Sequence, residues 1–334
     1  MSIKPVLRAS LAALLVCILL CSAASAEIHV GEEKPADWDQ RDLLKITFFE
    51  EVTDEAILIE CGGKVMMDDA GHGPYWQRLW PYLEEHGLTH IDIMYNSHPH
   101  YDHLEGEIYL VMLTDIQVDG FYSPFPEDYP HRLQKKAVKT LKEHNIPYHQ
   151  LMQDEPFKLG NAEIVMYYWP DGQDPNTLSG TLYITFGDST IMIPSDLTGP
   201  GQKYLLETYG DKLKCDILKV PHHGLGRLVT EFLPAVQPQL AIYTNYTKST
   251  AVCDRQLKKY DIPFMHTSAG TIYVETDGSD WYVEQIPTCW TRKPRSRKNK
   301  KPLDIVSVPN YNSIVRYRIF LKGVDYDERR KKKP

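Results

Sequence analysis

The chain has 334 residues, of which 42% are hydrophobic and 25% are charged, and its formal net charge is −8. This composition argues against an intrinsically disordered protein, and the length suffices for one large core or two modest ones. The charge is divided unevenly, because residues 292–334 hold fifteen Lys and Arg against four Asp and Glu. A basic tail therefore follows an acidic body. No Gly-x-Gly-x-x-Gly segment follows an early strand, which argues against a Rossmann dinucleotide-binding enzyme.

The N-terminal stretch 1–26 differs from the rest of the chain. Lys4 and Arg8 precede the apolar run 11–20, and Ala24-Ser-Ala26 offers small residues at a cleavage site. This pattern is typical of a secretory signal peptide; the alternative is an uncleaved anchor, although the apolar run is short for a membrane span. We therefore expect an exported protein, secreted or held in the cell envelope. Four later cysteines permit disulfides without indicating their pairing: Cys61, Cys215, Cys253 and Cys289.

Regular structure is expected to begin after residue 43. The segment 27–43 is polar and carries no periodicity, so we predict a flexible stretch there. Three strands follow, the last two joined by a turn at Gly62-Gly63, and then a helix with an apolar stripe leads into a buried strand. A helix, a strand and a basic amphipathic helix come next. The predicted elements cover residues 44–49, 55–60, 64–68, 75–86, 91–95, 105–114, 116–122 and 131–145.

The loop after the strand at 91–95 holds an unusual set of polar side chains, Asn96-Ser-His-Pro-His-Tyr-Asp-His103. In an extended loop, His98 and His100 can face one side and share an ion. Asp102 and His103 then offer a carboxylate and an imidazole to a second ion about 3.5–4 Å away. Imidazole and carboxylate suit Zn²⁺ best, with manganese or iron as further options. The alternative is a polar loop that is rich in histidine and binds no metal.

Two later strands also end in candidate ligands. The apolar run 189–196 ends in Asp196, and the run 216–224 ends in His222-His223-Gly. The alternation of strands and helices along the chain predicts an α/β fold with two sheets covered by outer helices. The other predicted elements are strands within 146–169 and at 180–186, 240–245 and 263–274, and helices at 204–209, 231–236 and 251–260.

The spacing His-x-His-x-Asp-His at 98–103 resembles the metallo-β-lactamase superfamily, and Lys-Val-Pro-His-His-Gly at 219–224 resembles its DNA-uptake competence branch in particular. The resemblance covers residues 44–285 and implies a four-layer αββα sandwich. The metallo-β-lactamases proper have a further histidine ligand in the region that corresponds to the stretch between residues 149 and 222 here. This chain departs from them, because it has no histidine in that stretch. It also has Ser195 where the superfamily usually has glycine.

The resemblance implies a role for each motif residue. Asp196 would bridge two ions and His223 would be the last ligand, with His222 beside it to orient a ligand or the substrate. Asp69, in an Asp-Ala-Gly segment, would support the metal loops, although on local sequence it could equally cap the following turn. Asn176 and Ser179 would lie near the first ion. The expected ligands of this two-ion site are then His98, His100, Asp102, His103, Asp196 and His223.

These residues predict a metal-dependent hydrolase, in which two ions lower the pKa of a water molecule that attacks phosphorus or a carbonyl carbon. Asp102 and Asp196 are the candidate catalytic residues, and Asp102 can also orient the nucleophile. No Gly-x-Ser-x-Gly elbow occurs. The resemblance to the competence branch places phosphodiester or related anionic substrates first. Hydrolysis of a lactam, lactone or thioester is second.

A different class of function also fits the sequence, namely a non-catalytic binding module with a degenerate metal site. The basic C-terminal extension 286–334 would then hold the protein to nucleic acid or to a cell-envelope polyanion by counterion release. In the hydrolase interpretation, the same extension can gather a polyanionic substrate. The sequence does not indicate an oligomeric state.

Overall fold

The computed structural model describes residues 26–50, 54–245 and 250–286. All of them belong to the first of two compact units, Met1–Cys289, and the second unit is Trp290–Pro334. Within the described ranges, no helix combines the length and the apolar character that a bilayer span needs.

Several sequence predictions fall on other parts of the chain. The predicted signal peptide, apart from Ala26, and the basic extension beyond Ile286 lie outside the described residues, as does Cys289. The other three mature cysteines are described, and each is buried with a free thiol: Cys61, Cys215 and Cys253.

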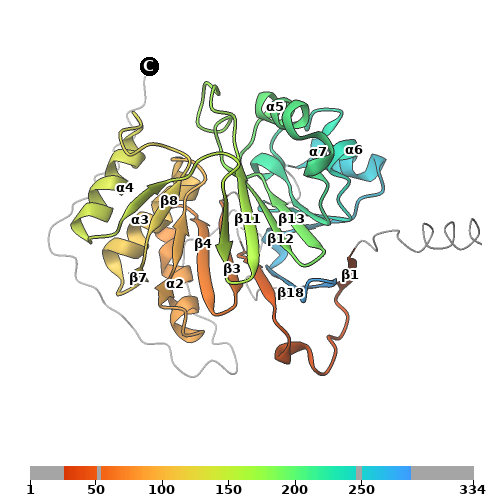
Figure 1. Cartoon of the computed structure of the whole chain (residues 1–334), viewed down its shortest axis with the longest axis horizontal. Helices are drawn as coiled ribbons and strands as arrows, with labels where there is room; N and C mark the ends of the chain where they lie inside the picture. Colours follow the sequence, from red (N-terminus) through yellow and green to blue (C-terminus); the bar gives the residue numbers. More distant parts are fainter. Residues whose placement is uncertain (1–25, 51–53, 246–249, 287–334) are drawn as a thin grey trace, which may run out of the picture. The chain divides into compact units, whose positions relative to one another are not determined.

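Two β-sheets pack face to face in this unit (Figure 1), and the apolar core between them draws on both. The first sheet has nine strands in the order β1-β18-β17-β2-β3-β4-β6-β8-β9. From β4 to β9 its neighbouring strands are parallel. The strands are β1 (Glu27–Val30), β2 (Leu44–Phe48), β3 (Ala56–Cys61), β4 (Lys64–Ala70), β6 (Ile93–Tyr95), β8 (Phe121–Ser123), β9 (Tyr148–Gln150), β17 (Thr271–Thr276) and β18 (Asp280–Ile286).

The second sheet has seven strands in chain order, β10 to β16. Its first four strands are antiparallel and its last four, from β13, are parallel. A separate ribbon pairs β5 (His90–Ile91) with β7 (Gln117–Val118). The seven strands are β10 (Pro156–Leu159), β11 (Ala162–Tyr167), β12 (Thr181–Phe186), β13 (Ser189–Ile193), β14 (Ile217–Lys219), β15 (Leu240–Tyr243) and β16 (Phe264–His266).

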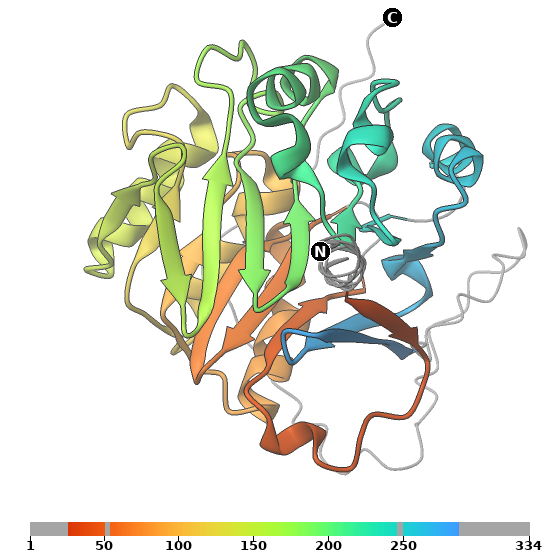
Figure 2. The same cartoon turned by 45° about the vertical axis from the view of Figure 1, so that its right-hand side comes forward.

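Helices cover the outer face of each sheet (Figure 2). Leu79 of α2, Leu104 of α3 and Leu141 of α4 share a buried cluster with the first sheet. Leu205 of α5 and Leu257 of α7 share another with the second sheet, together with α6. The helices are α2 (Trp76–Glu85), α3 (Tyr101–Leu113), α4 (Arg132–Glu143), α5 (Gly199–Tyr209), α6 (Phe232–Val236) and α7 (Ala251–Lys259).

Side chains of the central strands alternate between an inner and an outer core. In β3, Ile57 and Ile59 belong to the core between the sheets, whereas Leu58 belongs to the core under α2 and α3. In β14, Ile217 and Leu218 divide in the same way. Burial on both faces explains why these strands are continuous apolar runs. The order helix, sheet, sheet, helix confirms the predicted four-layer αββα fold.

The N-terminal segment 27–43, which we predicted to be flexible, contains regular structure. β1 pairs in parallel with β18. Trp38 is 2% exposed, and its Nε1 donates to Glu275 Oε2 at 2.8 Å. Both partners lie at the other end of the described chain, so no local periodicity indicates the pairing. The domain therefore begins at β1 and not at residue 44.

Other boundaries also differ from the sequence prediction. α3 begins at Tyr101 and not at Glu105, which places Asp102 and His103 in its first turn. The single strand predicted at 91–95 is divided between β5 and β6, because Asp92 leaves the strand and its Oδ2 accepts the Val65 N–H at 2.9 Å. β18 was not predicted.

We expect Gly106 to be required for the position of α3. A Cβ at this position would collide with the carbonyl oxygen of Ala70, and the Gly106 N–H donates to Gly71 O at 2.8 Å. Gly106→Ala should therefore lower the free energy of unfolding by about 1–3 kcal/mol, the usual cost of overpacking. Urea denaturation measures the loss. Gly199→Ala is the matched control, because Val229 Cγ1, at 3.7 Å, is the nearest atom its Cβ would meet. Equal stabilities of the two variants would refute the explanation.

Candidate metal centre

Three loops from the two sheets bring the predicted ligands together. His98 and His100 follow β6, Asp196 follows β13, and His223 follows β14. These strands lie in the parallel parts of their sheets, so the loops leave carboxyl ends, where sites in α/β proteins are generally built. Asp196 Oδ2 lies 3.7 Å from His98 Nε2 and 3.4 Å from His103 Nε2. Asp196 Oδ1 lies 3.1 Å from His223 Nε2.

The candidate ligand atoms form two clusters that share Asp196. One cluster consists of His98, His100 and Asp196, and His98 Nε2 faces His100 Nδ1 at 3.0 Å. The other joins Asp196 to His103 and His223, whose Nε2 atoms are 3.3 Å apart, and to Glu55. Within each cluster the ligand atoms lie within 4.8 Å of one another. The shared carboxylate is the arrangement that a bridging aspartate requires.

The donor atoms are better arranged to bind divalent cations than to form hydrogen bonds with one another. His103 Nδ1 contacts Asp69 Oδ2 at 2.6 Å, and His223 Nδ1 contacts Thr244 Oγ1 at 2.8 Å. If each Nδ1 carries the proton, each Nε2 presents a lone pair, and the two lone pairs face each other. Asp196 Oδ1 is buried and accepts no hydrogen bond from any described residue. A positive charge among these atoms would satisfy all of them at once.

The electrostatics of the buried groups agree with this interpretation. Burial lowers the pKa of His98 and of His223 well below the usual value, so both rings are held neutral, the form that binds metal. Burial alone would raise the pKa of Asp196, but His223 and His103 hold it well below its ordinary value. Burial would likewise lower the pKa of His103, yet Asp196 and Asp69 raise it well above the usual value. Asp196 and Asp69 therefore favour a positive charge at this position, which a bound cation would supply.

Asp69 lies beneath the metal loop and accepts several hydrogen bonds from it. Its Oδ1 accepts from the Ser97 N–H and from Asn96 Nδ2, both at 2.9 Å, and its Oδ2 accepts from Ser97 Oγ at 2.5 Å. Together with the contact to His103 Nδ1, these bonds fix the ring orientation of His103. The position agrees with the support role expected for Asp69, and the turn-capping alternative has no hydrogen bond in its favour among the described residues.

The remaining predicted residues lie around the clusters. Asp102 Oδ2 is 3.9 Å from His223 Nε2, and this side chain is 18% exposed, so it borders the second cluster without joining it. His222 Nε2 is 3.6 Å from Asp196 Oδ2 and 3.3 Å from Asn176 Nδ2. Ser179 is buried, and its hydroxyl donates to Pro175 O at 3.4 Å. Asn176 therefore reaches the site through His222, whereas Ser179 forms no hydrogen bond with a predicted ligand in the described part of the chain.

The backbone around the site is left-handed at several non-glycine residues. Such conformations are uncommon and tend to occur where surrounding packing fixes a functional loop. Of the eight described non-glycine residues with positive φ, four lie here: Asp69 at 53°, Ser195 at 45°, His222 at 50° and His223 at 51°.

Sequence reasoning missed three residues that contact the site. Glu55 precedes β3 and is fully buried, Lys219 ends β14 and is fully buried, and Thr244 follows β15. Glu55 and Thr244 stand in no recognisable motif. Lys219 belongs to the quoted segment 219–224, but its type alone suggests a surface residue.

No family model matches the chain, and no curated protein matches it. Its fold is similar to several solved structures. CmlA, a diiron β-hydroxylase from Streptomyces venezuelae, is 11% identical over 73% of this chain and 55% of CmlA, with a TM-score of 0.47. YhfI, a metallo-β-lactamase fold protein from Bacillus subtilis, is 12% identical over 68% of this chain and 96% of YhfI, with a TM-score of 0.45. Igni18, a metallo hydrolase from Ignicoccus hospitalis, is 14% identical over 69% of this chain and 98% of Igni18, with a TM-score of 0.45.

We expect Asp69→Asn to weaken metal binding without removing a ligand. The amide cannot accept all the bonds that the carboxylate accepts, so the ring of His103 loses its fixed orientation. Metal affinity should fall about 10–100-fold, as for other outer-shell partners. Competitive titration of Zn²⁺ into the metal-free protein measures the change. Asp188→Asn, in the exposed turn between β12 and β13, is the control. Unchanged affinity in Asp69→Asn would show that the contact with His103 has no positioning role.

Proposed function

We propose that the protein is an exported metal-dependent hydrolase that acts on phosphodiesters or related anionic substrates. One observation carries the proposal: Asp196, from the second sheet, faces His98 of the loop after β6, His103 of α3 and His223 of the loop after β14. A shared carboxylate between two histidine clusters suits a pair of cations better than it suits a structural network.

Each residue near the clusters has a separate task in this proposal. When bound, two divalent ions would lower the pKa of a water molecule and polarise the oxygen atom that gains charge. His98 and His100 would hold one ion, His103 and His223 the other, and Asp196 both.

Partly exposed polar side chains beside the two clusters would transfer protons and contact the substrate. Burial raises the pKa of Asp102, so its Oδ2, beside His223, is suited to orient the attacking water and to hold its proton. His222 is 32% exposed and is faced by Asn176, which places its ring where substrate can touch it. Ser97 and Ser195 are buried, and their hydroxyls bond each other at 2.6 Å, so neither is free to act as the nucleophile.

The surface next to the site supports an anionic substrate. α4 carries five cationic side chains in twelve residues, while residues 1–291 as a whole hold 22 Lys and Arg against 41 Asp and Glu. The helix begins beside His131, whose ring centroid is 6.0 Å from that of His100. Because charges are screened over about 8 Å at physiological salt, acidic residues farther away than this offset little of the positive charge, although two nearby glutamates pair with two of the cations. The five cations are Arg132, Lys135, Lys136, Lys139 and Lys142.

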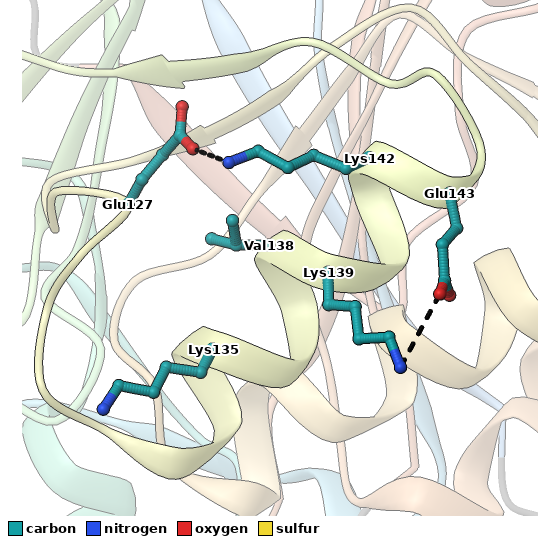
Figure 3. Close-up of a pocket in the computed structure, with 6 residues that line it drawn as sticks. All are labelled: Glu127, Lys135, Val138, Lys139, Lys142 and Glu143. Carbon is teal, nitrogen blue, oxygen red and sulfur yellow. Dashed lines mark ion pairs between the residues drawn. The ribbon is translucent and has the colours of Figure 1, made fainter.

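Figure 3 shows the exposed side of this helix, where Lys135, Lys139 and Lys142 line an open pocket. Lys142 pairs with Glu127 at 2.7 Å and Lys139 with Glu143 at 3.6 Å. Lys135 forms no ion pair with any residue in the described ranges. Among the lysines of this pocket, it is the one closest in sequence to His131, from which it is separated by one helical turn.

Turnover by the metal-loaded protein tests the proposal. We expect hydrolysis of bis(p-nitrophenyl) phosphate, with little or no hydrolysis of a cephalosporin or an acyl lactone. Chelation should abolish the activity. Asp196→Asn should lower kcat/KM by more than the roughly 10–100-fold typical of an outer-shell change, because it alters a ligand itself. If only the cephalosporin were turned over, the protein would be a lactam hydrolase and not a phosphodiesterase. A protein that binds metal but cleaves none of the three would favour the binding module.

Neutralising the α4 face should weaken the binding of an anionic polymer. In Lys135→Gln/Lys139→Gln, the slope of log affinity against log salt for a single-stranded oligonucleotide should become shallower by roughly 1.4, the value for two lost phosphate contacts. Lys258→Gln/Lys259→Gln on α7 is the control, since α7 covers the other sheet. Fluorescence anisotropy across a salt series measures both slopes. If the two double variants shift equally, the α4 face has no special role.

A further inference from the structure

A fully buried ion pair lies beneath the metal centre and joins the two sheets. Lys219 Nζ, at the end of β14, contacts Glu55 Oε2, just before β3, and both side chains are 0% exposed. Moving two charges out of water is unfavourable, and a pair of apolar side chains of similar volume would often be as stable. Stability alone therefore does not account for the pair, and its contacts suggest what does.

Lys219 reaches the loop that carries Asp196. Its ammonium group donates to the carbonyl oxygen of Ser195 at 2.9 Å. Ser195 has a φ of 45° and stands directly before Asp196. The same carbonyl accepts the N–H of His222 at 2.8 Å, so one oxygen ties together the two loops that follow β13 and β14. Lys219 therefore fixes the carbonyl on which the direction of Asp196 depends.

Glu55 reaches the other side of the site through its backbone. Its N–H donates to Asp102 O at 3.1 Å, and its carbonyl accepts the N–H of Gly71 at 2.7 Å. Its Oε2 also lies 3.9 Å from His223 Nδ1. Glu55 thus contacts the first turn of α3 and the segment after Asp69, while Lys219 contacts the Asp196 loop. The ion pair links these two halves of the centre.

We propose that Glu55 and Lys219 are a positioning pair, which holds the Asp196 loop in register with the histidines of the first sheet. The inference rests on the proposed function, because it concerns the same two clusters. Glu55 belongs geometrically to the second cluster, but its Oε2 contacts the Lys219 ammonium group. As a direct ligand, Glu55 would have to bind a cation through Oε1 or share Oε2 between the cation and Lys219. The positioning role keeps the ion pair intact.

Two variants separate positioning from both stability and direct ligation. Glu55→Gln/Lys219→Met removes both charges together, so no lone charge stays buried and the net charge near the site is unchanged. The Ser195 carbonyl, however, loses the Lys219 ammonium donor and keeps only the His222 N–H. Lys219→Met alone removes that donor and leaves the Glu55 carboxylate free. We expect the affinity for Zn²⁺, titrated into the metal-free full-length chain, to fall at least tenfold in both variants. The visible absorption of bound Co²⁺ should also change in band position or intensity, because the ligand geometry is altered.

The control is Ile217→Ala, two residues before Lys219 in the same strand. Ile217 is 0% exposed in the core between the sheets, so its truncation should lower the urea midpoint and leave Zn²⁺ affinity and the Co²⁺ spectrum unchanged. Wild-type affinity and spectrum in Glu55→Gln/Lys219→Met would overturn the positioning role. Affinity in Lys219→Met equal to or tighter than wild type would also overturn it and make Glu55 a ligand. A wild-type chain that binds no Zn²⁺ would overturn both this inference and the proposed function.

Discussion

The buried carboxylate of Asp196 determines how the two sheets must meet at their carboxyl ends. It is 2% exposed, and His223 and His103 hold its pKa well below the ordinary value. A buried charge of this kind is stable only if opposite charge or hydrogen-bond donors surround it. His98 and His103 come from the first sheet and His223 from the second, so the compensation requires both sheets in one register. The apolar core between the sheets has no such directional demand and would tolerate small shifts. Packing therefore brings the sheets together, and the carboxylate selects their alignment.

Neighbouring acidic residues show how strongly the partners decide the state of a buried carboxyl group. Asp68 is as buried as Asp69, but burial, together with the charges of Asp69 and Glu55, raises its pKa well above the usual value. Burial, together with the charges of Asp69 and Asp68, raises the pKa of Glu107 on α3 as well. Asp69 instead accepts hydrogen bonds from Ser97 and meets His103. The first sheet thus buries several acids in a small volume but gives charge-stabilising partners to the one that supports the metal loop.

The sequence predicted those parts of the site that are local. His98 to His103 form one short segment, and Asp196 and His223 each end an apolar strand, so their chemistry and their place at strand ends could be inferred. The role of Glu55 and Lys219 could not be inferred. A glutamate before one strand and a lysine at the end of another are ordinary surface patterns, and only tertiary contact makes them a pair. The same reason explains β1, whose partner strand lies at the far end of the domain. The start of α3 was missed because the metal-loop residues obscured the first turn of the helix.

The anchoring of the site's loops in buried strands and helices explains why the site tolerates so much unfavourable geometry. Left-handed backbone at Ser195 and His223, facing lone pairs of histidines, and a buried lysine would each destabilise an isolated loop. Here the loops are anchored at both ends in strands or helices whose apolar residues are almost completely buried, for example Ile191 in β13 and Ile217 in β14. Rigid strands hold the donor atoms close together. Because packing and the contacts of Asp196 together fix that proximity, the free energy of cation binding need not be used to order the loops, and the site is preorganised for a positive charge.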